Sequence, residues 1–549
     1  MRLLQLLTGP QATPRYRLIV SAGLSGLAST LVLAIVNMAA QEIADGSHDG
    51  VDWLFAGVFA GSILTYLAAE LYLIGRSTRD IETALHDMRV RLLTLLRGAD
   101  PLKLEHFGEA RLYESIARGS EAISRNAPYL AMNFRSVVQV LAVAIYIGSI
   151  SLLALGLVVT VIAIAGWKYI GMARMTQARY GEVQQEENRL FESTDDLIDG
   201  FKEVRLSSAR SRDLGEAFAG LSDRARSVGV DVQIAAFHQS IFGQVAFFFL
   251  LGVIVFVVPS YSQTFSTQVV QITTAALFMI GPLSGAIQSV TVLGAAEADA
   301  ARMFELEQLL RDMQEPKGEV TGAPLPAGLE SLRLEGVAFR YPGRAEDETF
   351  ALGPVDLAIR QGEIVFITGG NGAGKTTLVK LLTGLYAPDA GRLLWNSTAV
   401  TDGLRANYRE LISAVFSDFH LFRRFHGLTR FDAARAGALL RLMELEGVVD
   451  ISAQGFGRTD LSAGQRKRLA LIAALLEDRP LLVLDEWAAD QDPRFRKRFY
   501  REILPALRAE GRTVIAITHD DHYFDAADRR LHLDAGSLRE ITLAEGAGS

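Results

Sequence analysis

The chain divides into an apolar N-terminal half and a C-terminal half in which short apolar runs alternate with polar segments. A helix that crosses a bilayer needs about 20 mainly apolar residues. The N-terminal half contains stretches of this length, and we expect membrane spans at 16–40, 52–75, 127–149, 151–172, 236–259 and 267–290. The first stretch follows Arg2, Arg15 and Arg17 and has no small-residue cleavage site. The pattern therefore predicts a retained helix and not a signal peptide.

Basic residues are distributed unevenly between these spans. The connections at 41–51, 150 and 260–266 contain no Lys or Arg, whereas the long segments 76–126 and 173–235 are rich in Arg and each contains one Lys. Because positively charged loops stay on the cytoplasmic side, we expect both long segments and both termini to be cytoplasmic. A large soluble helical protein would not alternate basic and non-basic connections in this way.

The long segments are periodic as well as basic. Apolar residues recur at near-helical spacing through 83–97, which predicts membrane helices that continue into the cytoplasm. Glycine and proline mark the expected turning points, at Asp100–Tyr113 and at Asp196–Arg205 around Gly200. A Pro/Gly-rich stretch then ends the membrane part. We expect a transmembrane domain over 1–311, a linker over 312–330 and an α/β domain over 331–549.

The α/β half contains a strand, a glycine-rich loop and a helix in succession. EIVFIT at Glu363–Thr368 reads as a buried strand, GGNGAGKT follows at Gly369–Thr376, and Thr377–Leu385 has a helical apolar pattern. Glycines let backbone N–H groups surround phosphate oxygens at a helix N-terminus. Lysine at this position reaches the β- and γ-phosphates, and the following hydroxyl binds Mg²⁺. We expect phosphate contacts from Gly369, Asn371, Gly372, Gly374, Lys375, Thr376 and Thr377.

Two further strands end in polar residues. LLVLDE at Leu481–Glu486 is an uninterrupted apolar run that closes on two carboxylates, and TVIAIT at Thr513–Thr518 is followed by His519. Ligands of α/β sheets bind at the carboxyl ends of the strands. We therefore expect Asp485 to bind Mg²⁺, Glu486 to orient or deprotonate the attacking water, and His519 to contact the γ-phosphate.

Charge and cysteine content exclude several classes of function. The net charge is −8, and no basic stripe points to a nucleic-acid partner. The chain has no cysteine, which excludes disulfides, cysteine catalysis and thiolate zinc sites.

LSAGQ at Leu461–Gln465 lies between the phosphate loop and LLVLDE. With these motifs in this order, residues 330–545 resemble the nucleotide-binding domain of an ATP-binding-cassette transporter, and the apolar half resembles the six-helix domain of the exporter class. The resemblance implies an all-α transmembrane domain fused to an α/β P-loop ATPase, with ATP and Mg²⁺ as cofactors. With one cassette per chain it also implies a dimer, in which Ser462, Gly464 and Gln465 contact ATP held by the other subunit. We expect that subunit to be a second copy of this chain, and a heterodimer is the alternative. Tyr341 matches the aromatic that stacks on adenine, and Asp492 matches the acidic end of the loop that communicates across the dimer.

The chain departs from the common cassette pattern at two places. Many cassettes have a glutamine that contacts Mg²⁺ and couples to the membrane helices, but AVFSDFHLF places Ser417 there, followed by Asp418. Serine is too short for this contact, so we expect Asp418 or a water molecule to supply the ligand. Because Ser417 replaces the glutamine, we do not expect coupling to the membrane helices by the usual amide. The acidic motif that commonly precedes the LSxGQ sequence is also missing and is replaced by AQGFGRTD.

The cassette details resemble a particular group of exporters. VFSDFHLF, LSAGQRKRLALIAALLEDRP, DEWAADQDP and THDDHYFDAADR are similar to the cyclic-peptide and siderophore exporter group, which includes exporters of pyoverdine precursors and syringomycin-type lipopeptides. The resemblance implies ATP-driven export of a peptide-like siderophore precursor from cytoplasm to periplasm across the bacterial inner membrane, with further envelope components as possible partners. The alternatives are a lipid or lipopeptide flippase and an ATP-gated channel or regulator. Intact Glu486 and His519 weigh against the last.

Polar residues inside the apolar spans are the candidates for cargo contact. Arg135 lies within the third span, and placing it against lipid would cost about 2.5–3.5 kcal/mol, so we expect it to face the bundle interior. Gln139 falls on the same helical face. Glu70, Gln244 and Gln271 offer polar groups from other spans. An internal Arg135–Glu70 pair that only holds helices together is the competing interpretation.

Overall fold

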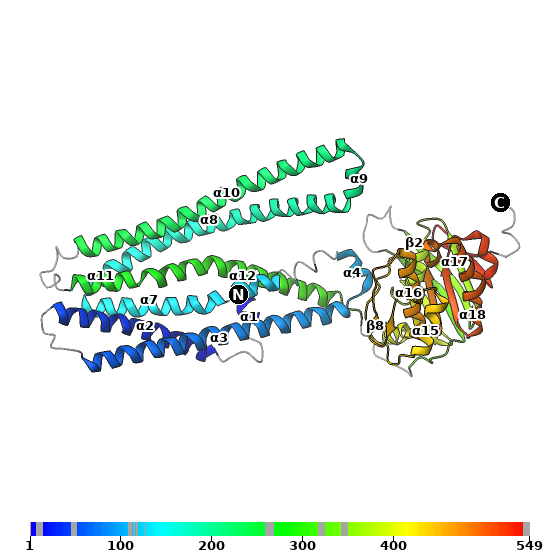
Figure 1. The fold of residues 1–549 in the computed structure, drawn as a ribbon, viewed down its shortest axis with the longest axis horizontal. Coiled ribbons are helices and arrows are strands. Elements are labelled where there is room, and N and C mark those ends of the chain that lie inside the picture. The colour runs from blue at the N-terminus through cyan, green and yellow to red at the C-terminus, as the bar shows by residue number, and fades with distance from the viewer. Residues whose placement is uncertain are drawn as a thin grey trace. The chain divides into compact units, whose positions relative to one another are not determined.

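The computed structural model describes residues 2–6, 15–44, 52–107, 112, 116, 119–126, 128–257, 268–316, 324–341 and 350–541. It forms two compact units (Figure 1). The first comprises Met1–Arg97 and Gly108–Asp312, and the second comprises Gly98–Phe107 and Met313–Ser549. A ten-residue segment between two membrane helices is therefore part of the C-terminal unit.

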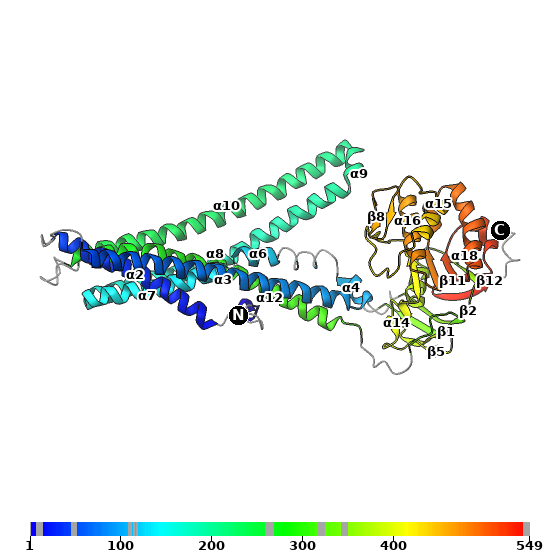
Figure 2. The ribbon, with the colours of Figure 1, turned by 60° about the horizontal axis from the view of Figure 1, so that its bottom comes forward.

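The first unit is all-helical over its described residues. Its long helices are α2 (Arg15–Ala44), α3 (Trp53–Arg97), α7 (Pro128–Ile150), α8 (Leu152–Asp199), α10 (Ser208–Gly252) and α12 (Ile280–Asp312). Its short ones are α1 (Arg2–Leu6), α6 (Gly119–Asn126), α9 (Phe201–Arg205), η2 (Val253–Val257) and α11 (Val269–Phe278). Figures 1 and 2 both show α8 and α10 side by side, diverging from the bundle of α2, α3, α7 and α12.

Among the described residues, six helical segments are long and apolar enough to cross a membrane. They are Ile19–Glu42, Trp53–Arg97, Met132–Ile150, Leu152–Asp199, Ser208–Val257 and Val269–Asp312. Trp53 and Trp167 are both 81% exposed, as expected for side chains that face lipid. Each of the six predicted spans is confirmed as mainly helical over its described residues, and residues 127, 258, 259 and 267 of these spans lie outside them.

The turn predicted around Gly200 is confirmed. Helix α8 ends at Asp199, and the Gly200 N–H is hydrogen-bonded to the carbonyls of Asp196 and Ile198. A Cβ on Gly200 would lie 2.9 Å from the Asp196 carbonyl oxygen, so a side chain is disfavoured there. After α9, the Ser207 side chain caps α10 by accepting a hydrogen bond from the Arg210 N–H. The other predicted turn, Asp100–Tyr113, lies partly outside the described residues.

The second unit contains two main sheets. An antiparallel sheet has the order β2–β1–β4–β5, with β1 (Ser331–Arg340), β2 (Ala351–Arg360), β4 (Ala390–Trp395) and β5 (Thr398–Ala399). The larger sheet has the order β12–β11–β3–β10–β9–β6, with β3 (Ile364–Gly369), β6 (Ile412–Val415), β9 (Leu481–Asp485), β10 (Thr513–Ile517), β11 (Arg529–Asp534) and β12 (Ser537–Ile541). A small ribbon joins β7 (Ile451–Ser452) to β8 (Gly455–Phe456).

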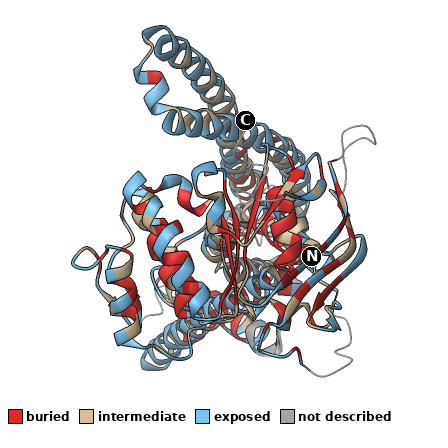
Figure 3. Cartoon of the chain, turned by 90° about the vertical axis from the view of Figure 1, so that its right-hand side faces the viewer, coloured by how far each residue is buried: buried red, intermediate tan, exposed pale blue. Residues whose placement is uncertain are grey.

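Helices pack against the larger sheet, and the strands they enclose are buried (Figure 3). The helical elements of the whole second unit are α4 (Pro101–Phe107), α13 (Lys375–Leu382), α14 (Arg405–Arg409), α15 (Ala433–Leu442), α16 (Ala463–Leu476), η5 (Trp487–Asp490), α17 (Pro493–Arg498), η6 (Phe499–Ile503), α18 (Leu504–Ala509) and η7 (Asp521–Ala526). Continuous apolar runs form β9 and β10 because parallel strands are covered on both faces.

Parallel pairing brings the functional motifs to one edge of this sheet. Ile517 at the end of β10 lies opposite Asp485 of β9 on one side and Ile367 of β3 on the other. The residues that follow the three strands therefore meet at their carboxyl ends, where ligands of such sheets bind.

Candidate active site

The glycine-rich loop between β3 and α13 depends on two glycines whose environment excludes side chains. Gly369 has φ 149°, and a Cβ there would lie 2.2 Å from the Leu533 carbonyl oxygen. Gly374 has φ 100°, and a Cβ there would lie 2.3 Å from the Phe350 ring. These glycines let the backbone pass directly into α13, whose first N–H groups are free to bind an anion. Gly372 also has a positive φ, and Asn371 is exposed beside it.

Lys375 is the buried cation of this loop. Its side chain is 7% exposed, and its Nζ lies 3.1 Å from the carbonyl oxygens of Gly369 and Gly370. The same Nζ is 4.0 Å from Glu486 Oε1. The ammonium therefore lies inside the loop that surrounds the predicted phosphates.

Asp485 lies buried beside two hydroxyl groups. Thr376 Oγ1 and Ser417 Oγ each lie 3.4 Å from Asp485 Oδ2. Burial, and then the negative charge of Glu486, raise the pKa of the Asp485 carboxyl. The three side chains form a cluster of oxygen ligands in which a cation would favour the ionised carboxylate.

Glu486 follows directly and adopts a conformation that is rare for a non-glycine residue, with φ 49°. Its N–H is hydrogen-bonded to the Ile517 carbonyl at 3.1 Å, which holds the backbone in place. His519 Nε2 lies 3.3 Å from Glu486 Oε1, and both side chains are partly exposed. Strained conformations of this kind cluster at functional sites. The carboxylate lies between Lys375 and His519, accessible to water, as a residue that orients a nucleophilic water requires.

The loop after β6 presents Ser417, and not Asp418, to this cluster. The hydroxyl of Ser417 donates a hydrogen bond to Asp485 Oδ2. Asp418 is exposed, and within the described part of the chain no hydrogen bond joins its carboxylate to the site. The contacts therefore do not support the expected assignment of Asp418 as a metal ligand, and they place the shorter Ser417 side chain next to the carboxylate.

Tyr341 lies beside the phosphate loop. Its hydroxyl is 3.0 Å from Oγ1 of the buried Thr377, in the first turn of α13. Its ring packs edge-on against Phe339 at a centroid distance of 5.2 Å. Thr377 is thereby engaged by Tyr341, whereas Thr376 faces Asp485. The predicted stacking of Tyr341 on adenine remains a prediction.

LSAGQ forms the start of α16. Ser462 is the N-cap residue, and its exposed side chain forms a reciprocal capping box with Gln465. A Cβ on Gly464 would lie 2.7 Å from the Asp490 carbonyl oxygen, so this position packs closely against the segment after β9. The predicted contact of Ser462, Gly464 and Gln465 with a partner's nucleotide stays a prediction.

Two buried basic residues that follow LSAGQ were not anticipated. Lys467 Nζ lies 2.9 Å from the Glu486 carbonyl oxygen and 2.8 Å from Asp490 Oδ2. Arg468 bonds Gln491 at 2.7 Å and Asp492 at 2.8 Å, and its guanidinium stacks 3.5 Å from the Phe495 ring centre. The available signal was the run of three basic residues, Arg466 to Arg468, in the first half of an otherwise largely apolar helix. Lys467 and Arg468 connect α16 to the segment from Glu486 to Asp492.

Asp492 has partners within its own chain. It caps α17 by accepting a hydrogen bond from the Phe495 N–H at 2.9 Å. This bond, together with Arg468, lowers the pKa of the Asp492 carboxyl. Its expected role in communication across a dimer is untested.

Comparison with known proteins agrees with this geometry. A sequence profile of the ABC transporter family matches residues 352–489. The chain is 33% identical over 533 residues to the ATP-binding protein SyrD of Pseudomonas syringae pv. syringae, covering 94% of this chain and 92% of SyrD. The chain belongs to the ABC transporter family. It is an ATP-hydrolysing exporter whose helical membrane domain is fused to the cassette.

Two further relatives show how widely this architecture is shared. An ATP-dependent lipid A-core flippase of Alkalilimnicola ehrlichii is 26% identical over 547 residues, covering 93% of this chain and 89% of that protein. The structure of a bacterial Atm1-family ABC exporter with ATP bound superposes with a TM-score of 0.75 at 19% identity, over 95% of each chain. That similarity confirms the exporter fold.

The ABC cassette motifs fit Mg²⁺ as well as ATP. Thr376, Asp485 and Ser417 offer only oxygen atoms, which are the ligands that Mg²⁺ prefers. When bound, the ion neutralises charge that develops between the β- and γ-phosphates. We expect the protein's own groups to have separate tasks, in which the glycine loop and Lys375 would hold the phosphates and Glu486 with His519 would position water.

Proposed function

We propose that this ABC exporter moves a peptide-like siderophore precursor, of the pyoverdine type, from cytoplasm to periplasm across the bacterial inner membrane. The observation that carries the proposal is the 33% identity to SyrD along nearly the whole chain, membrane helices included. Cassette similarity alone would not indicate cargo, since the cassette only supplies energy. The sequence of the membrane domain is the part that must differ between cargoes.

We propose further that the working unit is a homodimer. Among the described residues of its own chain, the exposed Ser462 side chain forms hydrogen bonds only in the capping box of α16. A second copy facing it head to tail would bring this serine to the nucleotide bound at Lys375 of the first. Mixing wild-type and Lys375→Ala protomers tests this arrangement: shared sites predict a more than proportional loss of turnover as inactive protomers are added.

Lipid flipping is the second candidate, because the observed relatives include lipid A-core flippases. The relative from Paraburkholderia xenovorans (strain LB400) is 27% identical over 390 residues, covering 68% of this chain. These similarities are lower than that to SyrD. A flippase would be stimulated by lipid A-core, and an exporter of peptides by the peptide precursor.

The deciding experiment uses the purified chain in lipid nanodiscs. We expect a linear peptide siderophore precursor to raise ATP turnover severalfold, and lipid A-core to leave it unchanged. Uptake of the same precursor by inside-out vesicles should require ATP and should be lost in Glu486→Gln. Stimulation by lipid A-core alone would overturn the proposal in favour of flipping.

A further inference from the structure

His519 follows strand β10, and little holds its ring in place. The side chain is 48% exposed, and among the described residues the ring has one hydrogen-bond partner, Glu486 Oε1 at 3.3 Å. A ring that is not enclosed by packing takes its position from the backbone that carries it. The residues on either side, Thr518 and Asp520, therefore determine where the imidazole lies.

These two flanking residues belong to a closed set of hydrogen bonds. The Asp520 N–H donates to the Thr518 hydroxyl at 3.1 Å, and the Tyr500 hydroxyl donates to Asp520 Oδ2 at 2.8 Å. A phenol has a single proton to donate, and a carboxylate only accepts. The Thr518 hydroxyl therefore donates the remaining bond, to the Tyr500 oxygen at 2.6 Å.

This set of hydrogen bonds is anchored in the core of the second unit. Thr518 is 4% exposed and Tyr500 is 1% exposed. Burial raises the pKa of the Tyr500 hydroxyl, which keeps it protonated and able to donate. The Tyr500 ring stacks on Tyr523 at a centroid distance of 4.7 Å and meets Phe366 of β3 edge-on at 5.7 Å. Packing against the sheet thus fixes the phenol that holds Asp520.

Arg496 of α17 connects this support to a second segment. Its Nη1 lies 3.1 Å from Asp520 Oδ1, the carboxylate oxygen on the other side. Its Nη2 donates to the carbonyls of Ala489 and Gln491, at 2.9 and 3.1 Å. A guanidinium suits this position because it presents several N–H donors in one rigid plane. Both carbonyls belong to the segment that directly follows Glu486.

Arg496 therefore joins the two loops that carry the water-positioning pair. Glu486 begins one loop, at the end of β9, and His519 begins the other, beyond β10. The separation of the two side chains depends on how these loops lie relative to each other. A displacement of about 1 Å in a catalytic group can cost about 100-fold in rate, even when the change that causes it lies elsewhere.

We propose that Arg496, Tyr500 and Asp520 are positioning residues for ATP hydrolysis, which hold His519 at a fixed place beside Glu486. Asp520 is the central group, because its two carboxylate oxygens bond Arg496 and Tyr500 separately. The inference concerns hydrolysis and does not depend on which cargo is exported. It does rest on the assignment of Glu486 and His519 to the attacking water.

Steady-state ATP turnover of the full chain in lipid nanodiscs tests this role. Asp520→Asn and Arg496→Gln should each lower kcat about 10- to 100-fold and leave KM for ATP within about twofold, because the phosphate loop is untouched. Tyr500→Phe removes one hydrogen bond and should lower kcat about 3- to 10-fold. Asp525→Asn is the control, since it breaks an exposed pair with Arg501 between η6 and η7. Its kcat should stay within about twofold of wild type.

A double variant separates one shared action from two independent defects. If Arg496 and Asp520 act through their contact, the Arg496→Gln, Asp520→Asn variant should be no slower than the slower single variant. Losses that multiply would overturn the pairing. A KM that rises as kcat falls, together with a lower unfolding temperature, would indicate a general disruption of the fold and would also overturn the positioning role. The same holds if both single variants turn over like Asp525→Asn.

His519→Ala distinguishes a failure of the inference from a failure of the assignment beneath it. Loss of turnover in His519→Ala, with normal turnover in Asp520→Asn, would keep His519 in the mechanism and overturn its proposed support. Normal turnover in His519→Ala would remove His519 from the mechanism, and the inference would fail with it. Peptide export stands in either case, because stimulation by the precursor tests it separately.

Discussion

Lys380 and Glu105 form a two-point ion pair, in which the Lys380 ammonium lies 2.9 Å from both oxygens of the Glu105 carboxylate. The Tyr386 hydroxyl also donates to Glu105, at 2.7 Å, and burial together with this carboxylate raises the pKa of the Tyr386 hydroxyl. The Tyr386 ring stacks on Phe339, which in turn contacts Tyr341. Helix α4 is thereby linked to the aromatic side chains beside the phosphate loop.

We expect Glu105→Gln to weaken coupling more than folding. The pair is partly exposed, with side-chain exposures of 49% for Glu105 and 18% for Lys380, so its loss should cost under about 1 kcal/mol. Basal ATP turnover should stay within about twofold, whereas the stimulation by cargo should fall severalfold. Glu335→Gln, which breaks the exposed pair with Arg392, is the control. Equal stimulation of ATP turnover by cargo in the two variants would show that the Glu105–Lys380 pair of α4 does not contribute to coupling.

Glu486→Gln should separate nucleotide binding from hydrolysis. The amide keeps the size of the side chain but cannot accept a proton, so turnover should fall by about 10²-fold or more. ATP affinity, measured with a fluorescent analogue, should be retained. Lys375→Ala should instead weaken ATP binding, because it removes the buried ammonium from the loop. Turnover near wild type in Glu486→Gln would refute its assignment to the attacking water.

Ser417 and Asp418 can be distinguished by magnesium titration. The sequence predicts Asp418 or a water molecule as the missing Mg²⁺ ligand, whereas in the structure it is the Ser417 hydroxyl that lies 3.4 Å from Asp485 Oδ2. We now expect Ser417→Ala to raise the Mg²⁺ concentration for half-maximal turnover about 3- to 10-fold, and Asp418→Ala to change it little. The reverse order would restore Asp418 as the ligand. Equal, small effects would show that this loop does not contribute to the metal site.

The raised pKa of Asp485 predicts that magnesium stabilises the protein less at acidic pH. Without metal, the folded state holds the Asp485 proton to higher pH than the unfolded state, so its ionisation destabilises the fold as pH rises above about 4. Mg²⁺ favours the ionised form and must displace this proton. The increase in unfolding temperature on adding MgATP should therefore grow as pH rises through the raised pKa of the Asp485 carboxyl. In Asp485→Asn that dependence should be lost, and an unchanged dependence would contradict the assignment.

Arg135→Gln tests whether the Arg135–Glu70 pair is architectural. Both side chains are largely enclosed, at 18% and 13% exposure, and removing one partner leaves the other charge without its counterion. We expect a lower unfolding temperature in Arg135→Gln, partly recovered in the Arg135→Gln, Glu70→Gln double variant. Stimulation by cargo should persist in the double variant. Its loss there, with stability restored, would indicate that the pair binds cargo.

Local patterns were sufficient for the nucleotide site and the membrane helices. Apolar length alone identifies a spanning helix, because the bilayer thickness sets it. Strand, glycine loop and helix are contiguous from Glu363 to Leu382, so the positions of Lys375 and Thr376 follow from their order in the chain. Asp485 and His519 meet at one sheet edge because parallel strands align their carboxyl ends.

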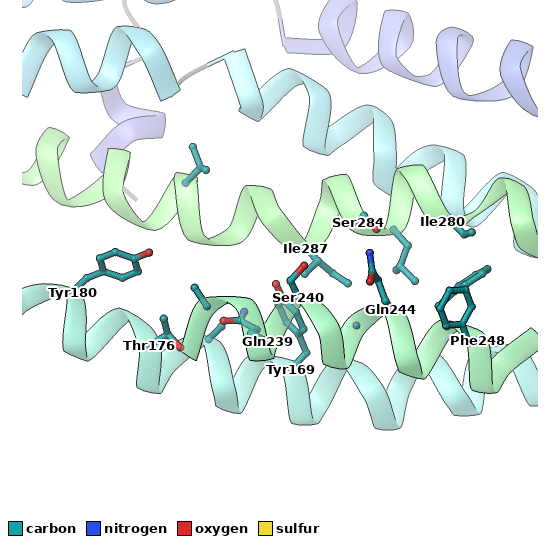
Figure 4. A pocket seen from close by; sticks show the side chains of 16 residues that line it. Tyr169, Thr176, Tyr180, Gln239, Ser240, Gln244, Phe248, Ile280, Ser284 and Ile287 are labelled. Atoms are coloured by element: carbon teal, nitrogen blue, oxygen red, sulfur yellow. The ribbon is translucent and has the colours of Figure 1, made fainter. Parts of the chain in front are cut away.

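Contacts between distant segments were decided only by the tertiary structure. The sequence does not show which of Ser417 and Asp418 lies next to Asp485, and in the structure the hydroxyl of Ser417 does. Glu105 meets Lys380 across 275 residues, and no periodicity relates the two positions. The cavity between α8, α10 and α12 (Figure 4) likewise combines faces of three helices, each of which reads from its sequence only as a helix with a few polar residues. Sequence patterns report the regularity of one element, whereas sites of this kind depend on how separate elements pack.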